Sequence, residues 1–261
     1  MTEEAPAGPE AELVARLRAG GLAGAHQSHS RESNVANAGR LSTGDPDFTF
    51  GMPDVASATT EEALAAVAEL TGAREPGEPY IDPAATLRGV RQAAEALAAA
   101  CCRGARILVA TGHPTGLLVH HARLVAAIAA AGGSLLQPLD DEVAYRVDGR
   151  RRSIRYFGGV ATLTDGANVL HTHLPDAMEA MLDAGPVPDL VFADHGYAGA
   201  AVARGIPAIA VMDTNDPALA VAWRRGADLR VIPMDDNRRP ASYDVIAELF
   251  ELGLGGNGHE G

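Results

Sequence analysis

The chain has 261 residues, a formal net charge of −13 at pH 7 and a hydrophobic fraction of 47%. That length is enough for one sizeable α/β core, and the acidic balance disfavours nucleic acid and anionic membrane surfaces as partners. No apolar stretch reaches the roughly 18 residues of a membrane-spanning helix, and the acidic N-terminus is unlike a signal peptide. We therefore expect a cytoplasmic protein with no membrane or nucleic-acid partner, whereas the sequence leaves open whether it forms a homo-oligomer.

The sequence contains no lysine, so all 21 residues of the Lys and Arg class are arginines. This excludes catalysis through a lysine Schiff base, pyridoxal phosphate anchored on lysine, and the lysine-containing phosphate loop of nucleoside triphosphatases. The two cysteines, Cys101 and Cys102, are adjacent and cannot form an ordinary intrachain disulfide, which is typical of a reducing compartment.

The first hundred residues predict helices around a long polar segment. Helices are expected at 12–21, 59–72 and 82–102. Residues 1–10 have the composition of a disordered leader, and Thr59 or Thr60 can cap the second helix. Segment 25–54 is polar and turn-rich, which predicts a long loop; such a loop is often a lid or part of a site, and the alternative is a surface loop held by its own turns. We therefore expect a helical N-terminal region over 11–102 that packs on the core.

From Arg106 onward the sequence alternates between strand and helix patterns. Strands are expected at 105–112, 134–140, 168–173, 188–196, 206–213 and 229–236, and helices at 116–133, 174–185, 197–205, 216–227 and 241–253. A hairpin is expected at Asp148-Gly149. Repeated strand–helix units predict an α/β domain over 103–254, with a three-layer, Rossmann-like and mostly parallel sheet. The match of GLGGNG to a dinucleotide motif lies at a chain end and is rejected, because 255–261 has the composition of a disordered tail.

Polar residues follow the expected strands, and those strands end at one edge of the sheet. They are Gly112-His113, Asp140-Asp141, His171-Thr172-His173, Asp194-His195-Gly196, Asp213-Thr214-Asn215-Asp216 and Asp235-Asp236-Asn237. Ligands of open α/β sheets bind at the carboxyl ends of the strands. The opposite ends carry far less acid and no histidine, so the sequence predicts an active site at the carboxyl edge.

One subset of these residues has the chemistry of a metal site. His171 and His173 are two residues apart, so on a strand both imidazoles point to the same face. Asp194, Asp213 and Asp235 add carboxylate oxygens from other strand ends. An oxygen-rich set with histidines suits Mg²⁺, Mn²⁺ or a similar divalent ion. A hydrogen-bonded histidine pair without an ion is the alternative interpretation.

The remaining candidates would transfer protons or bind an anion. We expect His195, His113 and Asp194 to be catalytic. The expected substrate-binding residues are Arg31, Asn34, Gly112, Thr115, Gly116, Gly196 and Asn215. They combine an arginine that can pair with phosphate, glycines that allow close approach of the backbone, and the N-terminus of the helix after the first strand.

Other polar residues near the strand ends are expected to have plain structural roles. Asp216 precedes a proline and predicts a helix cap. Asp141 and Asp236 are expected to be solvated loop residues. His120 and His121 lie inside a helix and are expected to serve packing or the surface.

The motifs together resemble a family of bacterial, mainly actinobacterial, cytosolic proteins that are labelled as phosphatases. The likeness runs from about residue 30 to 250 and is carried by RESN, GD at 44–45, ATGHPTGLL, HTH, PDLVFADHGYAG, DTNDPAL and PMDD. It implies hydrolysis of a phosphate monoester. A more distant, shape-level resemblance is to the metal-dependent damage-control phosphatases, whose site lies at the same sheet edge. The chain departs from the family pattern at Asn237, where a histidine is expected, so Asn237 receives no catalytic role.

These observations favour a metal-dependent phosphatase. Its substrate would be a small phosphorylated metabolite, either a sugar or a nucleoside phosphate, and a metal-activated water would attack it. Two alternatives use the same polar edge. One is a lyase, cyclase or isomerase that acts on a small carboxylic acid. The other is a non-catalytic protein that binds a phosphorylated ligand.

Overall fold

The structure, a computed structural model, describes residues 8–25 and 28–255. At its centre is a sheet with strand order β11-β10-β9-β3-β4, in which every neighbouring pair is parallel. The strands are β3 (Arg106–Val109), β4 (Ser134–Leu135), β9 (Leu190–Asp194), β10 (Ala208–Met212) and β11 (Leu229–Pro233). The predicted three-layer α/β architecture with a mostly parallel sheet is confirmed.

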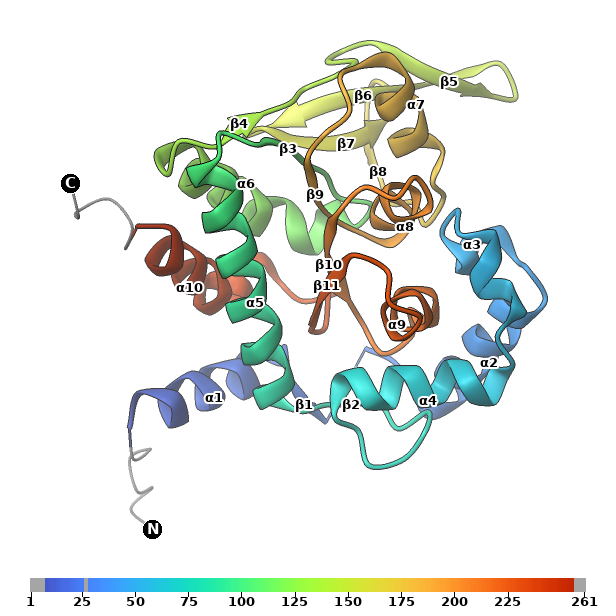
Figure 1. Cartoon of the computed structure of the whole chain (residues 1–261). Helices are drawn as coiled ribbons and strands as arrows, with labels where there is room; N and C mark the ends of the chain where they lie inside the picture. Colours follow the sequence, from blue (N-terminus) through green and yellow to red (C-terminus); the bar gives the residue numbers. More distant parts are fainter. Residues whose placement is uncertain (1–7, 26–27, 256–261) are drawn as a thin grey trace.

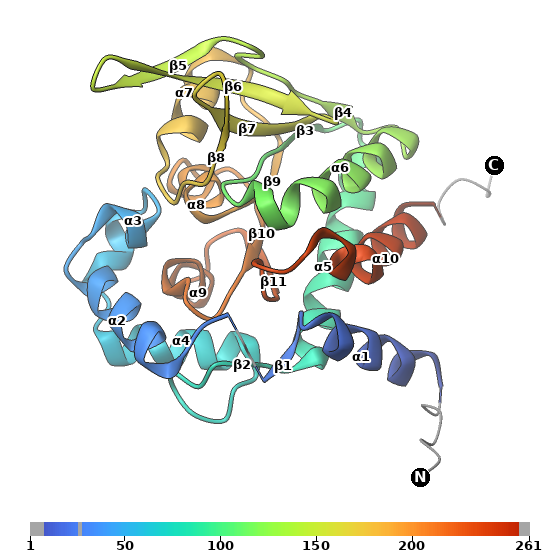
Figure 2. The same ribbon diagram turned by 180° about the vertical axis from the view of Figure 1, so that it is seen from behind.

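Side chains of the central strands alternate between two apolar layers, one on each face of the sheet. In β9, Val191 and Ala193 join one layer while Leu190 and Phe192 join the other. One layer is covered by α5 (Pro83–Cys102), α6 (Pro114–Ala130) and α10 (Asp244–Gly255), and the other by α7 (Asp176–Ala184), α8 (His195–Ala203) and α9 (Pro217–Arg224). Figures 1 and 2 show these two groups on opposite sides of β9–β11.

Most of the remaining helices precede the central sheet. They are α1 (Pro9–Gly20), α2 (Arg31–Ser42), α3 (Pro46–Thr49), the 3₁₀ helix η1 (Pro53–Ser57) and α4 (Thr60–Thr71), while a second 3₁₀ helix, η2 (Pro240–Tyr243), precedes α10. Strands β1 (Gly24–Ala25) and β2 (Tyr80–Ile81) form a small antiparallel pair. Helix α1 starts inside the segment 1–10 that was expected to be a leader. Residues 1–7 and 256–261, the rest of the expected leader and most of the expected tail, lie outside the described residues.

The expectation of a loop over 25–54 is wrong, because α2 and α3 form within it. A capping box starts α2: the Ser30 side chain accepts a hydrogen bond from the backbone of Ser33, and the Ser33 hydroxyl accepts one from the Ser30 backbone. Only Asn34, Ala38 and Leu41 of α2 are buried. This narrow apolar stripe explains why the hydrophobic periodicity gave no helix signal.

Helix α4 begins with a second capping box, at the predicted residue Thr59. Thr59 Oγ1 accepts a hydrogen bond from Glu62 N (3.1 Å), and Glu62 accepts one from Thr59 N (2.8 Å). Thr59→Ala should lower the free energy of unfolding by about 1 kcal/mol, because the helix loses the partner of a free N–H group. Urea denaturation measures this loss. Thr60→Ala changes the neighbouring helical residue and leaves the capping box in place, so it should have a clearly smaller effect.

A second, antiparallel sheet stands beside the carboxyl end of β3. It has the order β5-β6-β7-β8, with β5 (Val143–Val147), β6 (Arg150–Phe157), β7 (Val160–Thr164) and β8 (Val169–Leu170). The hairpin predicted at Asp148-Gly149 joins β5 to β6. The prediction of a parallel strand at 168–173 is wrong, because only β8 forms there and it pairs antiparallel with β7. The chain after β8 still reaches the central sheet, since Thr172 N donates to Gly112 O at 2.9 Å.

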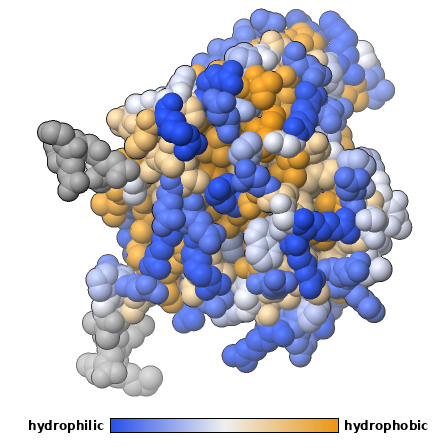
Figure 3. Space-filling model, in the orientation of Figure 1, coloured by the Kyte–Doolittle hydropathy of each residue, from blue (hydrophilic) through white to orange (hydrophobic). Residues whose placement is uncertain are grey.

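Hydrophilic residues dominate the surface, and two histidines of α6 lie in the interior. Hydrophilic residues cover much of the face shown in Figure 3 and surround the apolar residues near its centre. His120 and His121 of α6 are buried against Tyr243, Phe250 and Phe192, so the packing role predicted for them is confirmed. Over the described part of the chain, no helix combines the length and apolarity needed to cross a membrane.

Candidate active site

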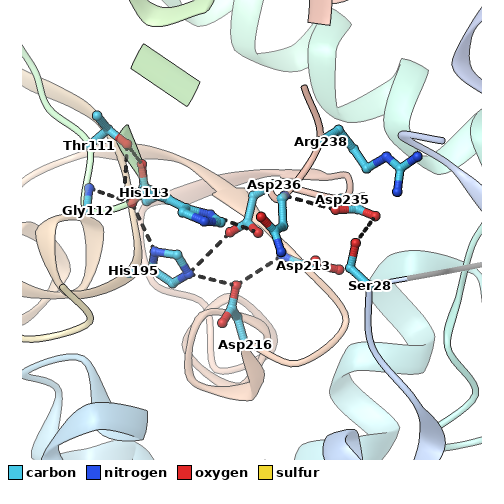
Figure 4. Close-up of polar contacts among 12 residues, drawn as sticks. Ser28, Thr111, Gly112, His113, His195, Asp213, Asp216, Asp235, Asp236 and Arg238 are labelled. Atoms are coloured by element: carbon cyan, nitrogen blue, oxygen red, sulfur yellow. Dashed lines mark hydrogen bonds and ion pairs between the residues drawn. The ribbon is translucent and has the colours of Figure 1, made fainter. Parts of the chain in front are cut away.

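The carboxyl ends of the parallel strands carry a cluster of buried polar side chains. Strands β3 and β9 are neighbours, but the chain leaves β3 toward β4 on one side and leaves β9 toward β10 and β11 on the other. Such a reversal of direction opens a crevice at the carboxyl edge, where open α/β sheets bind ligands. Residues that follow β3, β9, β10 and β11 meet there (Figure 4).

Asp194 and His195 form the centre of this cluster. Asp194 is fully buried, and its carboxylate accepts hydrogen bonds from Thr111 Oγ1 (2.5 Å) and Gly112 N (2.7 Å). His195 Nδ1 lies 3.0 Å from Asp194 Oδ1. The backbone of His195 has a φ of 43°, a left-handed conformation that costs on the order of 1–3 kcal/mol for a residue other than glycine. The strained turn and the bond to Asp194 together fix where the imidazole points.

The far side of the His195 ring faces two further carboxylates. Its Nε2 lies 3.2 Å from Asp236 Oδ2 and 3.5 Å from Asp216 Oδ2. Burial disfavours a charged imidazole, but the negative charges of Asp216, Asp194 and Asp236 raise the pKa of His195 well above its ordinary value. Burial would also raise the pKa of Asp236, yet hydrogen bonds from His113 and His195 lower it. The neighbouring carboxylates therefore favour the protonated form of His195, and its Nε2 atom must lose a proton before it can bind a metal ion.

Four carboxylates follow β10 and β11. Asp213, Asp216, Asp235 and Asp236 are 0%, 1%, 1% and 3% exposed. Burial raises the pKa of Asp216 to about 7. The negative charges of Asp236 and Asp213 also raise it, whereas His195 lowers it. Histidines are the cations that approach Asp216 and Asp236, and no arginine of the described residues pairs with either. Asp216 Oδ1 accepts no hydrogen bond from the described residues.

Further imidazoles lie on the other side of His195. His173 stacks on His195, with ring centroids 4.3 Å apart and 15° between the planes, and His113 stacks on His171 at 4.6 Å and 23°. Burial and neighbouring imidazoles lower the pKa of His171 and that of His173, the latter to about 3. Both rings are therefore neutral, which is the protonation state that binds metals.

Three groups within this cluster have the composition and spacing of metal ligands. They are His171 with His173 and His195, then His195 with Asp216 and Asp236, and finally Asp213 with Asp235 and Asp236. In each group, one ligand atom per residue lies within 4.8 Å of the others. The groups contain all the predicted metal ligands except Asp194. Asp194 accepts hydrogen bonds from Thr111 and Gly112, contacts His195 Nδ1, and lies 3.8 Å from His121 Nε2, so it is placed to orient His195 and belongs to none of the three groups.

The N-terminal segment adds two side chains that the sequence analysis missed. Ser28 Oγ donates a hydrogen bond to Asp235 Oδ2 at 2.7 Å, and His29 Nε2 lies 3.4 Å from Asp213 Oδ2. Burial lowers the pKa of His29, but the hydrogen bond and charge of Asp213, together with the charges of Asp216 and Asp236, raise it, so that it ends above its ordinary value. The segment AHQSHS contains both residues, yet nothing in its local pattern separates them from other loop polar residues.

Two predicted substrate-binding residues of this segment have other contacts. Arg31 is exposed and pairs with Glu75 at 2.9 Å. Asn34 is buried, donates to Gly77 O at 3.3 Å and accepts from Thr214 Oγ1 at 3.4 Å. These contacts join α2 to its neighbours, so we do not retain Arg31 and Asn34 in the proposed site.

The predicted glycines Gly112 and Gly116 lie where site loops touch. A Cβ at Gly112 would overlap the carbonyl oxygen of Thr172, and one at Gly116 would overlap that of Asp236. Glycine is therefore needed at both positions because the protein's own backbone packs closely there, and not because a ligand does. The glycines let the histidine-bearing and aspartate-bearing loops pack against the start of α6.

The other predicted binding residues differ in their access to the site. Gly196 packs against the carbonyl of His173 in the same manner. Thr115 is exposed in the first turn of α6. Asn215 is buried, and its side-chain oxygen accepts no hydrogen bond from the described residues.

Two of the plain structural roles expected from the sequence are wrong. Asp216 makes no side-chain capping bond to α9; its Oδ2 accepts from Asp213 N at 3.1 Å. Asp236 is buried and not solvated. Both errors have the same cause, because loops from neighbouring strands close over these residues. Asp141 is exposed and pairs with Arg155, as a loop residue should.

The fold and the site define an α/β protein with an acidic, histidine-containing centre at the carboxyl edge of its sheet. The family model described as Phosphatase matches residues 9–250, and the chain belongs to this family. It is 34% identical over 242 residues to Phosphatase SCO2771 of Streptomyces coelicolor, with 86% of this chain and 89% of that protein covered. The predicted family is thereby confirmed.

Proposed function

We propose that the protein is a divalent-metal-dependent phosphatase that hydrolyses monoesters of a small metabolite, such as a sugar or nucleoside phosphate. Membership of the phosphatase family supports the hydrolase activity. One observation supports the metal: four carboxylates are buried together beside neutral imidazoles. Buried like charges are stable only when cations pair with them, and the donor set is one that Mg²⁺, Mn²⁺ and related ions accept.

The residues fit such an ion. His171, His173 and His195 offer ring nitrogens, and Asp213, Asp216, Asp235 and Asp236 offer carboxylate oxygens. A bound divalent ion would polarise the phosphoryl group and lower the pKa of a water. Asp194 holds His195 through Nδ1, so the Nε2 atom is the one that faces the ion.

His113 is the proposed proton donor to the leaving oxygen. It lies at the start of α6, and its Nδ1 is 3.2 Å from Asp236 Oδ1. In the proposed reaction the water oxygen bonds to phosphorus while the ester P–O bond breaks; the proton of His113 passes to the alcohol that leaves, and the proton that the water loses restores His113 through solvent. The N-terminal turn of α6, which contains the exposed Thr115, would bind non-bridging oxygens.

Removal of metal tests this function. Protein stripped with a chelator should release phosphate from no member of a panel of sugar and nucleoside monophosphates. Addition of Mg²⁺, Mn²⁺, Co²⁺ or Ni²⁺ should restore release, and elemental analysis of the purified protein should find the ion. Asp141→Asn, which changes an exposed acid that pairs with Arg155 of β6, should behave like the unaltered protein. Full activity in excess chelator would contradict the proposal, and so would binding of a carboxylic acid without any phosphate release.

A further inference from the structure

The ligand atoms of the site divide into two chemically different sides. Toward the segment after β8 lie ring nitrogens, from His171, His173 and His195. Toward the ends of β10 and β11 lie oxygens, from Asp213, Asp235 and Asp236. The group of His195, Asp216 and Asp236 connects the two sides, since Nε2 of His195 is 3.2 Å from Asp236 Oδ2.

We propose that the site holds two cations of different kinds, which deepens the proposed function and rests on it. The imidazole subsite takes a transition-metal ion of the Co²⁺ or Zn²⁺ class, because nitrogen donors favour such ions. The carboxylate subsite takes a hard ion of the Mg²⁺ or Mn²⁺ class, because these ions prefer oxygen donors. Asp236 lies between the subsites and shares its carboxylate.

The buried carboxylates offer more oxygen donors than an ion of the imidazole subsite would use. Asp213, Asp216, Asp235 and Asp236 are all buried, and Asp213, Asp235 and Asp236 form a ligand group of their own. The buried Asp216 Oδ1, which accepts no hydrogen bond from the described residues, is an additional oxygen donor between the subsites.

The geometry of His195 also separates the subsites. Its Nδ1 is engaged by Asp194, so it has one nitrogen for a metal and can ligate a single ion. His173 stacks on His195, and one nitrogen of each ring lies within 4.8 Å of the other and of a nitrogen of His171. A phosphate ester that bridges the two ions would have its attacking and leaving oxygens stabilised together.

Metal binding to stripped protein tests the two subsites independently of activity. Co²⁺ is followed by its visible absorption and Mn²⁺ by electron paramagnetic resonance, and elemental analysis gives the stoichiometry when both are present. The unaltered protein should bind about two ions per chain. His171→Gln should weaken Co²⁺ binding by about tenfold or more and leave Mn²⁺ binding within about threefold, and Asp235→Asn should do the reverse. Asp141→Asn is the matched control, and circular dichroism checks that each variant is folded.

Each outcome is decisive. One ion per chain, or equal weakening of both metals by both variants, overturns the second subsite; if phosphate release still depends on metal, the proposed function stands. Two ions with the expected selectivity but no phosphate release from any ester would support the subsites and overturn the proposed function.

Discussion

His195→Asn should lower kcat/KM for phosphate monoesters by about a thousandfold or more. Asparagine is among the residues that tolerate the left-handed backbone found at position 195. Its amide can still donate to Asp194, as Nδ1 of the imidazole does. What it lacks is the Nε2 atom that lies near Asp236 and Asp216. The substitution therefore keeps the turn and removes the atom at the centre of the proposed chemistry.

Steady-state kinetics with the best ester of the panel, at saturating metal, measures this effect. Asp141→Asn serves as control and should retain activity within about twofold. Circular dichroism and the melting temperature should show a folded variant. An activity of His195→Asn within about tenfold of the unaltered protein would place the reacting centre elsewhere on the molecule.

Asp216→Asn should lower the activity by about a hundredfold or more. The same substitution should raise the melting temperature of the chelator-treated protein. The pKa of Asp216 in the fold is raised to about 7 from 3.8, so the folded state binds its proton more tightly than the unfolded chain does. Between these two values a rise in pH lowers the free energy of unfolding. The destabilisation that comes from ionising Asp216 in the fold is absent below about pH 4 and complete above about pH 8. Asparagine removes it and can still accept the bond from Asp213 N.

Differential scanning calorimetry in chelator tests this sign. At about pH 8 the variant should melt roughly 3 °C or more above the unaltered protein, and the difference should shrink toward pH 5. Asp141→Asn should shift the melting temperature little at either pH, because its carboxylate is exposed. A variant that melts below the unaltered protein at pH 8 would show that the charged form of Asp216 is not a cost to the fold.

The sequence predicted the parts of the fold that depend on strong periodicity or on turn chemistry. Strands β9, β10 and β11 are short apolar runs that end at or shortly before acids, and α5 begins at Pro83 with Asp82 as its cap. The helix α2 escaped prediction because it buries little apolar surface and is started by a serine pair. Its existence depends on contacts with α4 and α9 that are remote in sequence.

The candidate site was predictable as an edge but not as a set of contacts. The sequence indicated that His195, Asp213 and Asp235 follow strands, and that parallel strands bring such residues together. It could not distinguish Asp216 and Asp236, which are buried ligand candidates, from a helix cap and a solvated acid. Whether a loop residue is buried depends on neighbouring loops, and the local sequence around that residue does not show which loops will cover it.

The delivery of His171 and His173 by the antiparallel sheet, and not by the parallel one, separates the two halves of the centre mechanically. The segment after β8 is tied to the central sheet by the bond from Thr172 N to Gly112 O, while the aspartates follow β10 and β11. Lengthening or shortening the β7–β8 connection would therefore act on His171 and His173, whereas His195, which follows β9, and the aspartates belong to the parallel sheet. In the proposed metal site, variation of the antiparallel sheet would alter two nitrogen donors and leave the oxygen donors in place.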